Sequence, residues 1–127
     1  MIGIVNTGFG NINSIANIFF ENNIDSKFIE CKKDFVNVSK IILPGIGKFD
    51  TLINKLNHLN IIDDLNDFVL KKEIPILGIC IGMHIFYESS AEGCQNGLGW
   101  IKGKIEKLSC HETRLPHMGW NKLYNLK

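Results

Sequence analysis

The chain has 127 residues, of which 45% are hydrophobic and 21% are charged, and its formal net charge is +1. This length and composition indicate one ordinary globular domain with a real core, and the small net charge argues against binding to nucleic acid or to an anionic membrane surface. No stretch approaches the ~20 unbroken apolar residues of a membrane span, and no signal-peptide pattern opens the chain.

The four cysteines are widely spaced and form neither a C-x-x-C motif nor a paired Cys/His spacing; they are Cys31, Cys80, Cys94 and Cys110. This pattern argues against a zinc site and against a disulfide framework. We therefore expect free thiols, no metal, no cofactor and a cytoplasmic location.

Short apolar strands alternate with helical stripes along the first ninety residues. Strands are expected over residues 2–5, 27–29, 40–43 and 76–79. Helices are expected over residues 15–20, with an N-cap at Asn13 or Ser14, over 51–56, over 61–72 with a break near 58–60, and after Cys80 to about Ser89.

This alternation with short connections favours an α/β fold: an open, mostly parallel sheet with helices on both faces. After Gly93 the pattern changes, and residues 98–108 are expected to form an edge or antiparallel strand, with a further strand over 121–126. Since the sequence has no repeat, low-complexity tract or linker, we expect one domain over residues 1–127.

The strongest local motif is Gly78-Ile79-Cys80-Ile81-Gly82, which joins a buried strand to a helix. It has the pattern of a nucleophile elbow with Cys in place of Ser. Glycines leave space in such a tight, strained turn, and the helix N-terminus directs N–H groups at the sulfur and favours the thiolate. On this motif alone, a buried structural cysteine in a glycine-rich turn is an equal alternative.

Two other glycine-bearing turns, over residues 8–11 and 45–47, also follow predicted strands. In open α/β sheets, ligands bind beyond the carboxyl ends of the strands, so the three turns are expected to meet at one edge. Their convergence favours Cys80 as a nucleophile.

Four motifs occur together and in order: residues 8–11 (GFGN), 44–49 (PGIGKF), 78–83 (GICIGM) and 116–121 (PHMGWN). Together they make the chain resemble the glutaminase subunits of imidazole glycerol phosphate synthases, members of the class I glutamine amidotransferases, from Ile2 to about Leu123. The elbow alone would indicate only the broad class, whereas the 116–121 motif is more particular. The resemblance implies a flavodoxin-like fold.

The resemblance implies that Cys80 attacks the side-chain amide of glutamine, forms a glutamyl thioester and releases ammonia. The ammonia would pass to a separate synthase (cyclase) subunit in a heterodimer. The oxyanion would be held by the N–H of Ile81 and by that of Ile46 or Gly47. Substrate contacts are expected from Gly45, Gly82 and His84.

His84 stands where this family usually has Gln, so it could hold glutamine in an altered way or be a partly exposed helix histidine. Partner contacts are expected from Asn11, His117, Met118 and Trp120, with Trp120 as the anchor. Two alternatives remain open here: Trp120 could cover the sheet edge, and Asn11 could simply cap a helix.

The family completes its catalytic triad with a His-x-Glu pair near the C-terminus, and no such pair follows the 116–121 motif before Lys127. His111 and His117 do not match that position. We therefore expect a partial domain that lacks later strands, exposes an apolar sheet edge and has weak or no activity by itself.

Three other functions are compatible with the sequence. The first is a paralogous subunit that supplies ammonia for amino or acetamidino surface sugars, which Asn6, Thr7 and His84 keep open. The second is a catalytically silent module that docks on a synthase. The third is a thiol hydrolase or redox protein of flavodoxin-like fold, which would leave the 116–121 motif unexplained.

Overall fold

The computed structural model describes residues 1–108, 115, 116, 118–120, 122 and 124. Its main sheet has four parallel strands in the order β2-β1-β3-β4. These are β1 (Ile2–Val5), β2 (Ser26–Ile29), β3 (Lys40–Gly45) and β4 (Ile76–Cys80). All four expected strands are confirmed, since each is a short apolar run that ends at a polar or glycine-containing turn.

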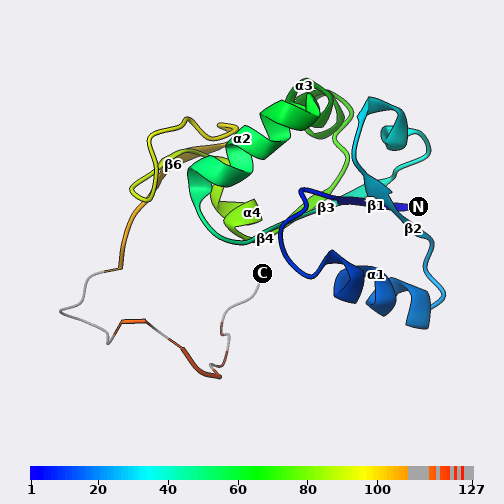
Figure 1. The fold of residues 1–127 in the computed structure, drawn as a ribbon, viewed down its shortest axis with the longest axis horizontal. Coiled ribbons are helices and arrows are strands. Elements are labelled where there is room, and N and C mark those ends of the chain that lie inside the picture. The colour runs from blue at the N-terminus through cyan, green and yellow to red at the C-terminus, as the bar shows by residue number, and fades with distance from the viewer. Residues whose placement is uncertain (109–114, 117, 121, 123, 125–127) are drawn as a thin grey trace.

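Helices lie on both faces of this sheet, as expected for a mostly parallel α/β fold. Helix α1 (Ile12–Glu21) lies on one face, and α2 (Phe49–Leu59), α3 (Ile62–Asn66) and α4 (Ile81–His84) lie on the other (Figure 1). A 3-10 turn η1 (Lys32–Phe35) follows β2, and a π-helical turn η2 (Asp67–Lys71) continues α3. Within the described part of the chain, no helix is long and apolar enough to cross a membrane.

The hydrophobic core lies between the sheet and the α2–α3 side. Ile41 and Leu43 of β3 face this side, where Phe49, Leu52 and Leu56 of α2 are at most 1% exposed. Full burial of such side chains contributes about 1.5–3 kcal/mol each. This layer fixes β3 and α2, the two elements that flank the 45–47 loop.

The opposite face is much less covered. No side chain of α1 is fully buried by the described residues, and Phe20 remains 82% exposed. On β4, the edge strand among the described residues, Leu77 and Ile79 are 57% and 39% exposed and alternate with Gly78, which faces α4. The described residues thus present apolar side chains at this edge.

The expectation of a long helix from Cys80 to about Ser89 is wrong. Helix α4 has only four residues, and the chain then enters strand β5 (Tyr87–Ser90), which pairs with β6 (Ile101–Ile105). A segment distant in the sequence occupies a carbonyl that a continuing helix would need: Leu98 N–H donates to the Ile85 carbonyl at 2.7 Å. This long-range pairing outweighs the local helical pattern of residues 83–87.

Strand β6 itself was expected, but its direction was not. It runs parallel to β5, in a separate two-stranded sheet, rather than as an antiparallel or edge strand of the main sheet. Gly97 makes the close approach possible, because a Cβ there would collide with the carbonyl of Tyr87. The further strand expected over residues 121–126 falls mostly outside the described residues.

Two helix boundaries also depend on asparagines. The N-cap of α1 is Asn11, not Asn13 or Ser14, and its side-chain oxygen accepts from Ser14 N–H at 3.2 Å. The break expected near residues 58–60 is confirmed: Asn60 ends α2 with a left-handed φ of 53°, a conformation that Asn tolerates better than most residues.

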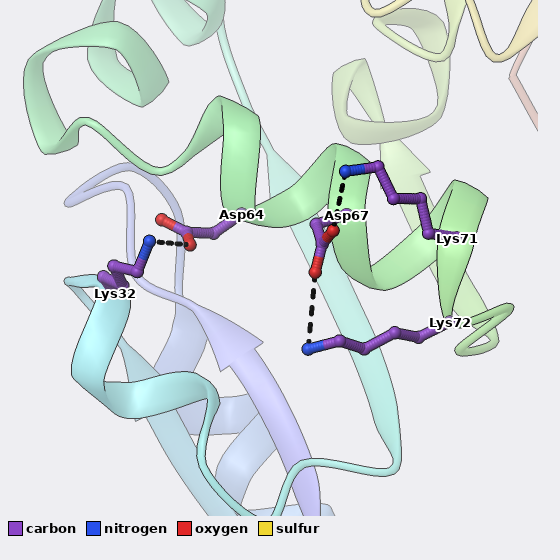
Figure 2. A network of polar contacts seen from close by, with 5 residues as sticks. All are labelled: Lys32, Asp64, Asp67, Lys71 and Lys72. Atoms are coloured by element: carbon purple, nitrogen blue, oxygen red, sulfur yellow. Dashed lines mark ion pairs between the residues drawn. The ribbon is translucent and has the colours of Figure 1, made fainter.

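One ion pair connects η1 to α3, and two others lie within the segment from Asp67 to Lys72 (Figure 2). Lys32 Nζ lies 3.0 Å from Asp64 of α3, and Asp67 of η2 pairs with Lys71 at 3.0 Å and with Lys72 at 3.4 Å. The lysines of these pairs are exposed, although the Asp64 side chain is only 16% exposed, and surface pairs contribute about 0–1 kcal/mol. The stability of this region therefore comes mainly from the apolar core beneath them.

A different carboxylate, Asp34, organises the turn after β2. Its Oδ2 accepts from the N–H groups of Glu30 and Cys31, both at 2.9 Å. These main-chain hydrogen bonds, with a weaker one from the Cys31 thiol, lower the pKa of Asp34 from its ordinary value. The ionised form is therefore favoured more strongly in the folded than in the unfolded chain.

We predict that the stability gap between the wild type and Asp34→Asn depends on pH. Because the folded pKa is lowered, the contribution is present above the unfolded value of about 3.9 and is lost as the pH falls through the folded pKa. Thermal melts between pH 7 and pH 2 should show the gap closing at acid pH. Asp63→Asn, at an exposed position, is the control, and a pH-independent gap would contradict the prediction.

Candidate active site at the turn between β4 and α4

Cys80 occupies a sharp turn between a strand and a helix. It is the last residue of β4, α4 begins at Ile81, and its backbone has φ 56° and ψ −122°. A non-glycine residue in such a conformation costs about 1–3 kcal/mol. The side chain is exposed. The structure therefore contains the strained turn that the motif predicts, and it does not bury Cys80 as a structural cysteine.

Glycines allow the segments around Cys80 to pack through their main chains. A Cβ on Gly78 would lie 2.6 Å from Met83 Cα, and one on Gly82 would collide with the Leu43 carbonyl. On the neighbouring strand, a Cβ on Gly45 would lie 2.7 Å from Gly82 N. β3, β4 and α4 therefore meet at distances that no other residue type permits.

The 45–47 loop lies beside Cys80, as expected. Gly45 is the register partner of Cys80 across the β3–β4 ladder. Ile46 is 54% exposed, and Gly47 has a φ of +90°, which favours glycine. The N-terminal loop reaches the same place, because a Cβ on Gly10 would lie 3.5 Å from Ile46 Cγ2. The expected convergence of the three turns is therefore observed, whereas the oxyanion contacts of Ile46, Gly47 and Ile81 stay predictions.

His84, the last residue of α4, faces the turn that follows β5. Its Nδ1 is buried without a hydrogen-bond partner among the described residues and lies 3.9 Å from Glu92 Oε2, too far for a hydrogen bond. Both side chains line a cavity of about 970 Å³ beside Tyr87, Lys104 and Pro116. The residues that line this cavity do not include Cys80, so the substrate contact of His84 stays a prediction.

The residues expected at a partner interface are only partly described. Asn11 is the cap of α1, which confirms the structural alternative for this residue without testing a partner contact. Met118 is 83% exposed and Trp120 is fully exposed, so Trp120 does not cover the sheet edge here. His117 lies outside the described residues.

Two acidic residues near the site had no assigned role in the sequence. Asp50, in the first turn of α2, accepts from the N–H groups of Cys94 and Gln95, both at 2.9 Å, and these bonds lower the pKa of its carboxyl group. Glu92 is the carboxylate beside His84. No local motif could identify them, because their partners are distant in the sequence or depend on how the turn folds.

Comparison with known proteins shows the family and the fold of the chain. The sequence model of the family "Glutamine amidotransferase class-I" matches residues 4–127, and the chain belongs to this family. A solved structure described as "Crystal structure of glutamine amidotransferase" superposes with a TM-score of 0.69 at 19% identity, covering 83% of this chain and 55% of that one. The expected flavodoxin-like α/β fold is therefore confirmed.

Several relatives carry the name imidazole glycerol phosphate synthase subunit HisH. The chain is 38% identical to the one from Leptospira interrogans, with 100% of this chain and 64% of that protein covered. It is 40% identical to HisH 2 from Methanococcus maripaludis, covering 95% and 60%, and 42% identical to a HisH subunit from Prochlorococcus marinus, covering 96% and 57%. The chain thus spans about three fifths of the length of these relatives.

We predict that Cys80→Gly is more stable than Cys80→Ala by about 1 kcal/mol, because glycine adopts the positive φ without strain and this outweighs its larger loss of backbone entropy. Both variants lack the thiol, so urea denaturation compares the backbone effect alone. Ala16→Gly, inside α1, is the control and should lose about 1 kcal/mol. If Cys80→Gly were the less stable of the two variants at this position, the strain argument would be wrong.

Proposed function

We propose that the chain forms the nucleophile-bearing part of a glutaminase, which hydrolyses glutamine and delivers the ammonia to a synthase subunit. The two subunits together would form the imidazole glycerol phosphate synthase of histidine biosynthesis. The observation that carries this proposal is Cys80, exposed on a strained strand-to-helix turn beside Gly45 and its loop. Membership in the class-I amidotransferase family and the names of the relatives support it. A cytoplasmic location is part of the same proposal.

The chemistry starts at the Cys80 sulfur. Sγ attacks the side-chain amide carbon of glutamine, the C–N bond breaks, and ammonia leaves with the thiol proton. The product is a glutamyl thioester, which water hydrolyses to glutamate while the thiol regains a proton. Ile81 begins α4 directly after Cys80, and Ile46 and Gly47 belong to the loop after β3. In this proposal, the N–H of Ile81 and that of Ile46 or Gly47 stabilise the oxyanion of each tetrahedral intermediate.

We assign the amino-acid end of glutamine to the cavity beside α4. Glu92 offers a carboxylate for the substrate ammonium group, and the side chains of Glu92 and His84 both line this cavity. His84 would then hold glutamine where the family usually uses Gln.

We predict that glutamine-dependent glutamate release depends entirely on Cys80. The assay measures glutamate with and without a cyclase subunit, and Cys80→Ala is the control for background. A chloroketone analogue of glutamine tests the nucleophile separately, since Sγ displaces its chloride to form a thioether that mass spectrometry locates.

Each outcome separates two of the functions considered. Glutamate release, or analogue labelling at Cys80 that free glutamine blocks, supports a glutaminase. If neither occurs and the chain still binds the cyclase subunit, it is a docking module. Activation by a synthase of surface-sugar biosynthesis, rather than by the cyclase, would instead assign the chain to the paralogous pathway.

We also propose that Trp120 anchors the synthase subunit, because a fully exposed Trp is an unusual surface residue and a typical centre of an interface. Trp120→Ala is predicted to weaken cyclase binding by about 2 kcal/mol or more, measured by isothermal titration calorimetry. The matched control is Tyr124→Ala, which removes another exposed aromatic from the same segment. Equal affinities for the wild type and Trp120→Ala would exclude this anchor.

A further inference from the structure

The turn between β5 and β6 is held from outside by one carboxylate. Cys94 N–H donates to Asp50 Oδ2 and Gln95 N–H donates to Asp50 Oδ1, each at 2.9 Å. Each oxygen of one carboxylate therefore binds a successive main-chain donor of the turn. Such charge-assisted, paired hydrogen bonds fix direction as well as distance.

Gly93, next to Cys94, leaves the space that the Asp50 carboxylate occupies. A Cβ on Gly93 would collide with Asp50 Oδ1, so the carboxylate occupies the space that any larger residue would fill. Gly93 is not among the glycines with positive φ, and its importance is therefore one of space rather than of backbone conformation. Substituting Gly93 is thus a second way to break the contact, independent of the charge of Asp50.

The two ends of this contact belong to different parts of the site. Asp50 is the second residue of α2, which begins directly after the 46–48 loop. Glu92 precedes Gly93, and its carboxylate lies 3.9 Å from His84 Nδ1. The hydrogen bonds of Asp50 therefore connect the loop beside Cys80 to the turn that carries Glu92, across 44 and 45 residues of sequence.

We propose that Asp50 is a positioning residue for glutamine: it holds the turn over residues 92–95 so that Glu92 stays beside His84 and at a fixed distance from the 45–47 loop. Asp50 itself does not touch the reacting atoms. This inference rests on the proposed glutaminase function and extends it to a residue outside the motifs.

The test uses the full chain and compares Asp50→Asn, Gly93→Ala, the double variant and the control Asp63→Asn, an exposed helix-terminal Asp. The rate of Cys80 labelling is measured with the chloroketone analogue of glutamine and with iodoacetamide, which reports thiol access alone. Amide hydrogen exchange over residues 91–97 reports whether the turn is held, and thermal melts confirm that each variant is folded.

Both single variants are expected to label about ten- to hundredfold more slowly with the glutamine analogue, since small displacements of a binding group have effects of this size. Labelling with iodoacetamide at Cys80 should change little, exchange over 91–97 should accelerate, and Asp63→Asn should match the wild type. Because both substitutions break the same contact, Cys80 in the double variant should be labelled no more slowly than in the slower of the two single variants.

Faster exchange with unchanged analogue labelling would overturn the positioning role, since the turn would then be held without affecting glutamine. Fully additive losses in the double variant would also overturn it. If free glutamine did not slow the labelling of wild-type Cys80 by the analogue and no glutamate were released, the proposed function itself would fail, and the positioning role with it. If free glutamine protects Cys80 in the wild type but the variants are labelled by the analogue at the wild-type rate, only the assignment of Asp50 is refuted.

Discussion

Main-chain contact between β3, β4 and α4 is the constraint on which the rest of the site depends. Gly45, Gly78 and Gly82 sit where three segments approach one another more closely than any Cβ allows. This contact places Gly45 opposite Cys80 in the ladder and forces the chain to turn sharply at Cys80. The apolar layer between β3 and α2 then keeps these segments in place, since close-packed protein interiors resist displacement.

Carboxylates stabilise turns at two separate places in this structure. Asp34 and Asp50 each accept two main-chain N–H groups from a turn, and in both cases these bonds lower the pKa of the carboxyl group. Main-chain donors are held by the fold itself, whereas the lysines of the surface ion pairs must give up side-chain freedom to pair. The fold therefore uses acidic side chains to fix loops and relies on apolar burial for its overall stability.

Much of this arrangement could be predicted from the sequence because its signals are local. Strand β1 and the break after α2 follow from apolar runs and polar stops, and the glycines around Cys80 predict a tight turn. The prediction of a long helix after Cys80 is wrong because the N–H groups of Leu98 and Ile101 donate to the main-chain carbonyls of Ile85 and Phe86. The anchoring of the 93–95 turn by Asp50 was missed for the same reason: both depend on residues that folding brings together from afar.

The backbone conformation of Cys80 also bears on what the chain is for. A protein that needed only this shape would be more stable with glycine at position 80, since glycine adopts a φ of 56° at little cost. The chain instead carries a thiol there and accepts a less stable turn. Strain that structure alone does not require is typical of a residue whose side chain is used chemically. The strained turn at Cys80 therefore fits the use of its thiol in the proposed glutaminase.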